Sequence, residues 1–279
     1  MSMYCAKRDG KNRICFFNDS IRSKNEKDNQ LTKDLRNGIS QNQFLLYFQP
    51  QIDRDFKIIG AEALLRWDHP INGILKPEEF MGFVENSNFI FPLGWYIIDQ
   101  TLSELSSWKM NEFTKDLCLS INLSLRQFEQ HDFVTILNQR IKHYQVDPTK
   151  ITLELTESQP SLNLHNLIFE FIQLKELGIK LSLDDLGTGY SSLSYLFKLP
   201  IHQVKTDRSF ILNLFKDEKS QIILKSLIGL AKSLNLILVV EGIETEEQKD
   251  WLFKYGCDIF QGHFFWPALS REDFFNAIS

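Results

Sequence analysis

The chain has 279 residues, of which 43% are hydrophobic and 24% are charged, and its formal net charge is −5 at pH 7. This composition is typical of a globular protein, and the length suits one (β/α) barrel of about 250 residues with a short extension, or two smaller domains. Lys and Arg are scattered without a basic block, so long nucleic acids are poor candidate partners. A small phosphorylated ligand remains compatible with the negative charge, because metal ions supply positive charge locally.

The cysteines and the hydropathy pattern indicate a cellular compartment. Cys5, Cys15, Cys118 and Cys257 form no CxxC pair and show no zinc-like spacing with a His, so we expect free thiols in a reducing compartment. No apolar run reaches the ~18 residues of a membrane span, and the N-terminus lacks an apolar signal core. We therefore expect a cytoplasmic chain, whose longer parent protein could still be attached to a membrane.

The first 40 residues differ in composition from the rest of the chain. Residues 1–18 are rich in Lys, Arg, Asn and Asp and are too short to fold alone. Within residues 19–40, three apolar side chains recur at helical spacing and predict a short amphipathic helix before Gly38. These side chains are Leu31, Leu35 and Ile39. We expect a helical linker at 19–40 and a separate domain at 41–279.

From residue 41, short β-rich apolar runs alternate with helical stretches. The expected strands are 44–52, 58–67, 117–124, 151–157, 179–186, 202–207, 236–243 and 257–265, and the expected helices are 92–109, 126–144, 161–177, 191–198, 209–234 and 245–255. This alternation predicts a parallel α/β architecture, most simply a barrel. The first two runs are separated by about five polar residues, too few for a helical crossover, so they should pair antiparallel. We predict a modified TIM (β/α)8 barrel with an antiparallel first strand.

Polar residues stand where the apolar runs end, in positions that the runs do not require. They are Gln49, Glu62, Asn122, Glu154, Asp184, Asp185, Lys205, Glu241 and Gln261. In a barrel the carboxyl ends of the strands meet at one rim, where catalytic residues collect. Five of these side chains are carboxylates, whose repulsion one lysine would not balance, so we predict divalent cations among them. Oxygen ligands favour Mg²⁺ or Mn²⁺ over zinc, and two such ions are typical of in-line phosphoester hydrolysis.

Each of these features also has an ordinary structural interpretation. A single Glu at a strand end is commonly solvated, and DDLGTGYSS (184–192) could be a strand–turn–helix connection with an Asx turn. Lys205 could lie on the surface, and Asn122 could serve only as a hydrogen-bonding residue at a strand end. The shared position at one end of successive strands favours a common site. Arg66 would add a planar fork suited to a phosphate.

Eight short segments strengthen this interpretation, because they follow one another in a recognisable order. They are YFQP (47–50), EALLRW (62–67), INLS (121–124), ELTES (154–158), DDLGTGYSSL (184–193), KTDRSFI (205–211), EGIET (241–245) and QGHFF (261–265). Residues 41–279 thereby resemble an EAL domain, the bacterial cyclic di-GMP phosphodiesterase. The resemblance implies a metal-dependent enzyme that opens cyclic di-GMP to linear pGpG.

The resemblance also implies a role for each residue. A first metal ion would be bound by Glu62, Asn122, Glu154 and Asp184, and a second by Asp184, Asp185 and Glu241. The catalytic residues would be Lys205, which holds or polarises the attacking water, and Glu241. Substrate contacts or support would come from Gln49, Arg66, Asp207 and Gln261, and Glu157 would anchor the loop at 187–192. Trp266 and Pro267 depart from the family's pattern at one edge of the rim.

The N-terminus carries a second resemblance. Residues 3–17 are similar to the final segment of a GGDEF domain, so residues 1–18 are predicted to be the remnant of such a domain in a longer protein with an upstream GGDEF or sensory domain. The family also implies a homodimer, formed through 191–198 and the start of 209–234. Two alternatives to catalysis remain. One is a catalytically silent cyclic di-GMP sensor acting through a partner, and the other is a pure interaction module.

Overall fold

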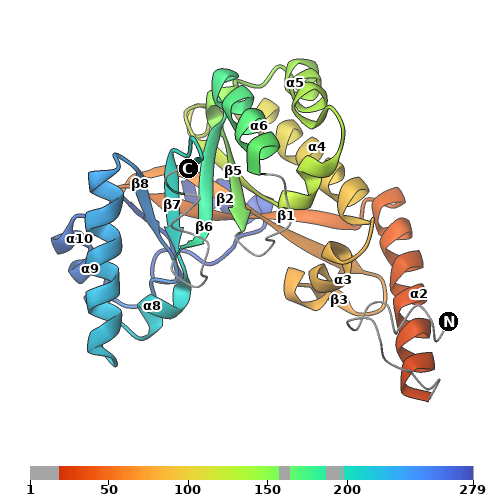
Figure 1. Cartoon of the computed structure of the whole chain (residues 1–279), viewed down its shortest axis with the longest axis horizontal. Helices are drawn as coiled ribbons and strands as arrows, with labels where there is room; N and C mark the ends of the chain where they lie inside the picture. The colour runs from red at the N-terminus through yellow and green to blue at the C-terminus, as the bar shows by residue number, and fades with distance from the viewer. Residues whose placement is uncertain (1–18, 157–163, 187–195, 197, 279) are drawn as a thin grey trace.

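The computed structural model describes residues 19–156, 164–186, 196 and 198–278 (Figure 1). In this part of the chain nine strands form one sheet in the order β1-β9-β8-β7-β6-β5-β4-β2-β3, and β1 also pairs with β2. Eight strands therefore close a barrel, and β3 extends the sheet beyond β2. The strands are β1 (Phe44–Ile52), β2 (Ile58–His69), β3 (Gly73–Leu75), β4 (Cys118–Leu123), β5 (Ile151–Thr156), β6 (Lys180–Leu186), β7 (Gln203–Thr206), β8 (Ile237–Val240) and β9 (Ile259–Phe260).

The first strand runs opposite to the others. β1 is antiparallel to both β2 and β9, and every other neighbouring pair in the barrel is parallel. The connection after β1 is a tight turn in which the Asp53 carboxylate accepts hydrogen bonds from the backbone amides of Asp55 and Lys57. Such a turn permits a hairpin but not a crossover helix. The predicted barrel with an antiparallel first strand is confirmed.

Helices pack around the barrel between the strands (Figure 1). The α-helices are α2 (Asp19–Ser40), α3 (Met81–Glu85), α4 (Ile90–Trp108), α5 (Phe133–Tyr144), α6 (Leu164–Glu176), α8 (Arg208–Leu212), α9 (Glu218–Ser233), α10 (Glu246–Tyr255) and α11 (Arg271–Ile278), and the 3-10 helices are η1 (Pro77–Glu79), η2 (Leu125–Glu129) and η3 (Pro148–Lys150). None of the helices described is both long and apolar enough to cross a membrane.

The helices differ from the sequence prediction in several places. The stretch 209–234 is divided, because Asp207 and Asp217 separately cap α8 and α9 by accepting hydrogen bonds from the amides two residues on. The stretch 126–144 is likewise divided, into η2 and α5. β3, η1, α3 and α11 were not predicted, because elements of three to eight residues carry little periodicity. The predicted remnant at 1–18 and most of the predicted helix at 191–198 lie outside the described residues.

The linker helix α2 packs onto the barrel through its predicted apolar face. Leu35 is fully buried in a cluster with Phe44, Leu65 and Trp67 from β1 and β2. α2 continues through Gly38 to Ser40, contrary to the expected end before this glycine. The reason is a close approach: a Cβ at Gly38 would lie 2.8 Å from Cε2 of Phe44 and 3.1 Å from Nε1 of Trp67. Helix and barrel therefore share one core, beside α3 and β3 (Figure 1).

This shared core gives a test of the docking of α2. Replacing the buried Leu35 with Ala should lower the free energy of unfolding by about 2–4 kcal/mol, through lost burial and a residual cavity. Arg36→Ala, at the neighbouring exposed position, should change it by less than about 0.5 kcal/mol. Urea unfolding followed by circular dichroism measures both, and equal stability of the two variants would show that α2 does not dock.

Candidate active site

The main residues of the candidate site project into the barrel from within its strands. Glu62 is the fifth of 12 residues in β2, Glu154 the fourth of six in β5, and Lys205 the third of four in β7. Their exposed fractions are 5%, 0% and 0%. The expectation that Glu62 ends its strand is wrong, because β2 continues to His69. The site therefore lies partly below the rim, in the interior of the barrel.

The ammonium of Lys205 lies among four carboxylates that come from four different strands or strand ends. Its Nζ is 2.5 Å from Oε2 of Glu154, 2.5 Å from Oε1 of Glu241, 3.1 Å from Oε2 of Glu62 and 3.9 Å from Oδ2 of Asp184. The barrel thus brings together residues that are up to 179 positions apart in the chain, as the distance from Glu62 to Glu241 shows. The predicted convergence of these five residues is observed.

Burial disfavours the charged form of most of these carboxylates. It raises the pKa of Glu154 to about 8, with Glu62 and Asp184 adding to the rise and Lys205 opposing it. Burial likewise raises the pKa of Asp184 and that of Glu241, again against the attraction of Lys205. One ammonium is therefore too little positive charge for the cluster.

Glu62 is the exception, because it has more hydrogen-bond donors. The amide nitrogen of Asn122 donates to its Oε1 at 2.6 Å, and that of Gln261 donates to its Oε2 at 2.7 Å. Burial acts to raise its pKa, but Lys205 and these two amides together outweigh burial, and the pKa is lowered. In turn, burial acts against the charge on Lys205, but the surrounding carboxylates raise its pKa well above the usual value. The ion pair of Lys205 and Glu62 is thus the charged centre of the site.

The two consecutive aspartates lie at a β-bulge. The pairing of β6 with β7 shifts register between Leu183 and Leu186, and Asp185 has a left-handed backbone with φ of 56°. Aspartate tolerates this conformation better than most residues do, because its short polar side chain bonds locally. Here the amide of Asp185 donates to Oδ1 of Asp184 at 2.9 Å. Burial raises the pKa of Asp185 to about 6, with Asp184 and Asp207 adding to the rise.

A small cavity of about 110 Å³ opens beside the cluster. It is lined by Gln49, Arg208, Glu241, Gly242, Glu244, Gln261, Gly262 and His263. The amide nitrogen of Gln49 donates to the carbonyl oxygen of Trp266 at 3.1 Å, so the segment that departs from the family's pattern supplies a backbone acceptor. Arg208 was not predicted as a site residue, and neither was Gln51, which is buried behind Gln261. The alternation of β1 would have placed Gln51 on the same face as Gln49.

Two predicted site residues, Arg66 and Asp207, have contacts outside the group around Lys205. Arg66 donates to the carbonyl oxygen of Leu65 at 2.8 Å, and its guanidinium lies 5.3 Å from the ring centre of Tyr47. Asp207 accepts the amide of Ser209 as the cap of α8, although it also adjoins Asp185. Glu157 lies outside the described residues. The structure gives no contact of Arg66 with the carboxylates among the described residues, so its assignment rests on the resemblance alone.

The donor set has the right chemistry for a hard divalent ion. The available atoms are carboxylate and amide oxygens, and Oε1 of Glu154 is buried without a hydrogen-bond partner. As they stand, however, no three His, Cys, Asp or Glu side chains in the described part of the chain are arranged to hold a metal ion. Lys205 takes the central position instead.

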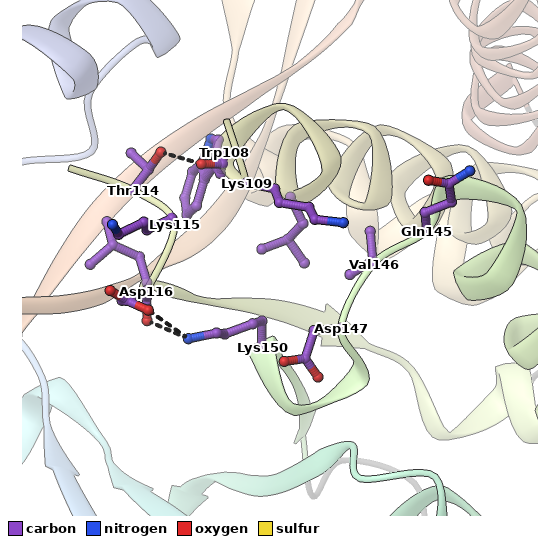
Figure 2. Close-up of a pocket in the computed structure, with 11 residues that line it drawn as sticks. Trp108, Lys109, Thr114, Lys115, Asp116, Gln145, Val146, Asp147 and Lys150 are labelled. Atoms are coloured by element: carbon purple, nitrogen blue, oxygen red, sulfur yellow. Dashed lines mark hydrogen bonds and ion pairs between the residues drawn. The ribbon is translucent and has the colours of Figure 1, made fainter. Parts of the chain in front are cut away.

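A larger cavity of about 440 Å³ lies elsewhere, beside the segments that precede β4 and β5 (Figure 2). Two of the lysines that line it have acidic partners: Lys115 lies 2.5 Å from Glu112, and Lys150 lies 3.7 Å from Asp116. The strands begin at this end of the barrel, so the cavity faces away from the carboxyl ends where catalytic residues collect. It is not the candidate active site.

Known proteins share this fold and sequence. The family model described as EAL domain matches residues 32–268. The chain is 33% identical over 279 residues to the "Bifunctional diguanylate cyclase/cyclic di-GMP phosphodiesterase MucR" of Pseudomonas aeruginosa, covering 100% of this chain and 41% of that protein. It is 31% identical over 274 residues to the "Cyclic di-GMP phosphodiesterase PdeR" of Escherichia coli, covering 97% of this chain and 41% of the relative.

A solved structure agrees with these matches. The structure titled "PaMucR Phosphodiesterase, c-di-GMP complex" superposes with a TM-score of 0.83 at 33% identity, covering 88% of this chain and 99% of that one. The fold is therefore that of an EAL-type barrel. The chain belongs to the EAL domain family. It spans about two-fifths of the length of the curated relatives MucR and PdeR.

The charge balance around Lys205 can be tested through stability. Lys205→Met removes the only ammonium that contacts the buried carboxylates among the described residues. In EDTA at pH 8 we expect the free energy of unfolding to fall by about 3–5 kcal/mol, because a buried ion pair is broken. Lys57→Met, at an exposed position, is the control. A Lys205→Met protein as stable as the control would mean that the cluster is neutral in the folded state.

Proposed function

We propose that this domain hydrolyses cyclic di-GMP to linear pGpG, with the aid of divalent metal ions. One observation carries the proposal: an EAL-family barrel encloses four carboxylates around Lys205, with too little positive charge to balance them. Bound cations would resolve this imbalance, and they would also offset the negative charge of a phosphodiester. Relatives named as cyclic di-GMP phosphodiesterases support the choice of substrate.

The metal ligands we propose are the carboxylate and amide oxygens of the cluster. Glu62, Asn122, Glu154 and Asp184 would hold one Mg²⁺ or Mn²⁺, and Asp184, Asp185 and Glu241 would hold a second. The unpartnered Oε1 of Glu154 supports this assignment, because a buried carboxylate oxygen without a donor is costly unless a cation binds it. Bound ions of this kind lower the pKa of a coordinated water and neutralise phosphate charge.

The other side chains act on the water and the substrate. Against the effect of burial, the surrounding carboxylates raise the pKa of Lys205, which supports a role for its ammonium as a hydrogen-bond donor that holds or polarises the attacking water. Glu241 is 25% exposed and lines the cavity, so its carboxylate can reach an incoming water or phosphate. The proposed substrate contacts are Gln49, Arg66, Asp207 and Gln261. Glu157 is proposed to anchor the loop at 187–192.

The rest of the parent protein is also a proposal. The chain spans about two-fifths of MucR and PdeR, which supports an upstream GGDEF or sensory domain whose signal reaches the barrel through α2. A homodimer through the EAL domain is proposed from the family alone. Light scattering of the purified chain, with cyclic di-GMP and without it, distinguishes a dimer from a monomer.

The central experiment is incubation of the protein with cyclic di-GMP and Mg²⁺ or Mn²⁺, followed by chromatography. We expect pGpG as the product, no product in EDTA, and a loss of turnover of at least ~10²-fold in Glu62→Gln and in Lys205→Ala. Lys57→Met should keep full turnover. Binding of cyclic di-GMP without cleavage would instead identify a sensor, and the absence of both would favour an interaction module.

Metal binding has a readout that does not depend on turnover. Mn²⁺ at 100 times its Kd should stabilise the folded protein by about 2.7 kcal/mol and raise its Tm. Glu154→Gln should largely remove this shift, because it replaces a proposed ligand. The control is Glu170→Gln on α6, a partly buried glutamate outside the cluster, whose pKa burial raises to about 7. An equal shift in all three proteins would place the metal outside the cluster.

A further inference from the structure

Gln51 forms the outer end of a chain of buried amides that leads to Glu62. It lies on β1 with an exposed fraction of 5%, and its Nε2 donates to Oε1 of Gln261 at 3.0 Å. Nε2 of Gln261 then donates to Oε2 of Glu62 at 2.7 Å and to Oε1 of Gln49 at 3.2 Å. Nε2 of Gln49 donates in turn to the carbonyl oxygen of Trp266. Each amide in this chain has one definite orientation.

The orientation of Gln261 depends on its partners, because the two ends of a carboxamide have nearly the same shape. If the amide turned over, its oxygen would face two acceptors, Glu62 and Gln49, and its nitrogen would face the donor Nε2 of Gln51. The contacts with Glu62 and Gln49 would become repulsive, and Gln51 would have to turn over as well to keep its hydrogen bond. Gln51 supplies the only donor to Oε1 of Gln261 within the described residues. Glu62 and Gln49 thus set which end of Gln261 donates, and Gln51 holds the opposite end of that amide in place.

The carboxamide of Gln51 has little other use at this place. Gln261 is its one hydrogen-bond partner in the described part of the chain. A buried amide costs free energy unless it is hydrogen-bonded, so a purely structural position in the barrel interior would be filled better by an apolar side chain. The contact to Gln261 is thus what the amide contributes.

We propose that Gln51 is a positioning residue of the active site, whose hydrogen bond to Oε1 of Gln261 holds that amide in the place from which it donates to Glu62. The inference rests on the proposed function, in which Glu62 is a metal ligand. Groups that orient a metal ligand in this way typically change metal affinity or activity by about 10–100-fold when removed.

A double-mutant cycle tests whether Gln51 acts through Gln261. Gln51→Met should reduce turnover and raise the Kd for Mn²⁺ by about tenfold, and Gln261→Met should reduce them at least as much. The double variant should be no worse than Gln261→Met, because the partner through which Gln51 acts is already gone. Gln203→Met on β7, which removes another buried glutamine (6% exposed), is the control and should leave turnover unchanged. The proposal is wrong if the losses of turnover in the two single variants multiply in the double variant. It is also wrong if Gln51→Met loses neither turnover nor affinity for Mn²⁺.

A second readout needs neither metal nor substrate. In protein labelled with ¹⁵N-glutamine, the side-chain amide signal of Gln261 is identified by its absence from Gln261→Met. A proton donated to the Glu62 carboxylate should be shifted downfield, and Gln51→Met should move or broaden this signal. If the wild type cleaves no cyclic di-GMP, the proposed function is wrong. The spectrum still tests whether Gln51 holds the Gln261 amide in place. An unchanged Gln261 signal in a folded Gln51→Met protein would overturn the inference.

Discussion

The contact between the buried Lys205 ammonium and its four carboxylates is the constraint on which the rest of this barrel depends. An unpaired buried charge costs several kcal/mol, a large part of the 5–15 kcal/mol by which a typical domain is stable. Glu62, Glu154 and Lys205 can be tolerated at 5% exposure or less only because strands from across the closed sheet bring opposite charges together. The surplus of carboxylates over ammonium is the chemical property that makes the site suited to cations.

Much of the fold could be predicted from the sequence, because its main signals are local. Strand-like runs separated by helical stretches gave all eight barrel strands, and the short turn at Asp53 gave the reversal of β1. The elements that were not predicted are short or depend on contacts distant in sequence. β3 pairs with the end of β2 over three residues. α2 passes through Gly38 because Phe44 and Trp67 approach its backbone, which no local pattern reveals.

The site was less predictable than the fold, since side-chain geometry decides it. The residues that meet at Lys205 were expected from their placement on successive strands, but the depth of Glu62 inside β2 was not. The bulge that turns Asp184 and Asp185 depends on pairing between β6 and β7. Arg66 follows Glu62 by four residues, and this spacing gave no reason to separate Arg66 from the cluster. In the structure its guanidinium lies over the ring of Tyr47. Gln51 was missed because its proposed role depends on its contact with Gln261, which is distant in the sequence.

The reversed first strand links the unusual topology to the site. Because β1 is antiparallel to both neighbours, Gln49 lies directly opposite Glu62 on β2, while Ile52 lies opposite Phe260 on β9. One strand therefore presents both Gln49 and Gln51 to Gln261, the residue that follows Phe260. Side chains two residues apart on a strand share a face, so both amides enter the barrel together. The hairpin that sets the direction of β1 thus also places the two amides that contact Gln261, which is one of the donors that lower the pKa of Glu62.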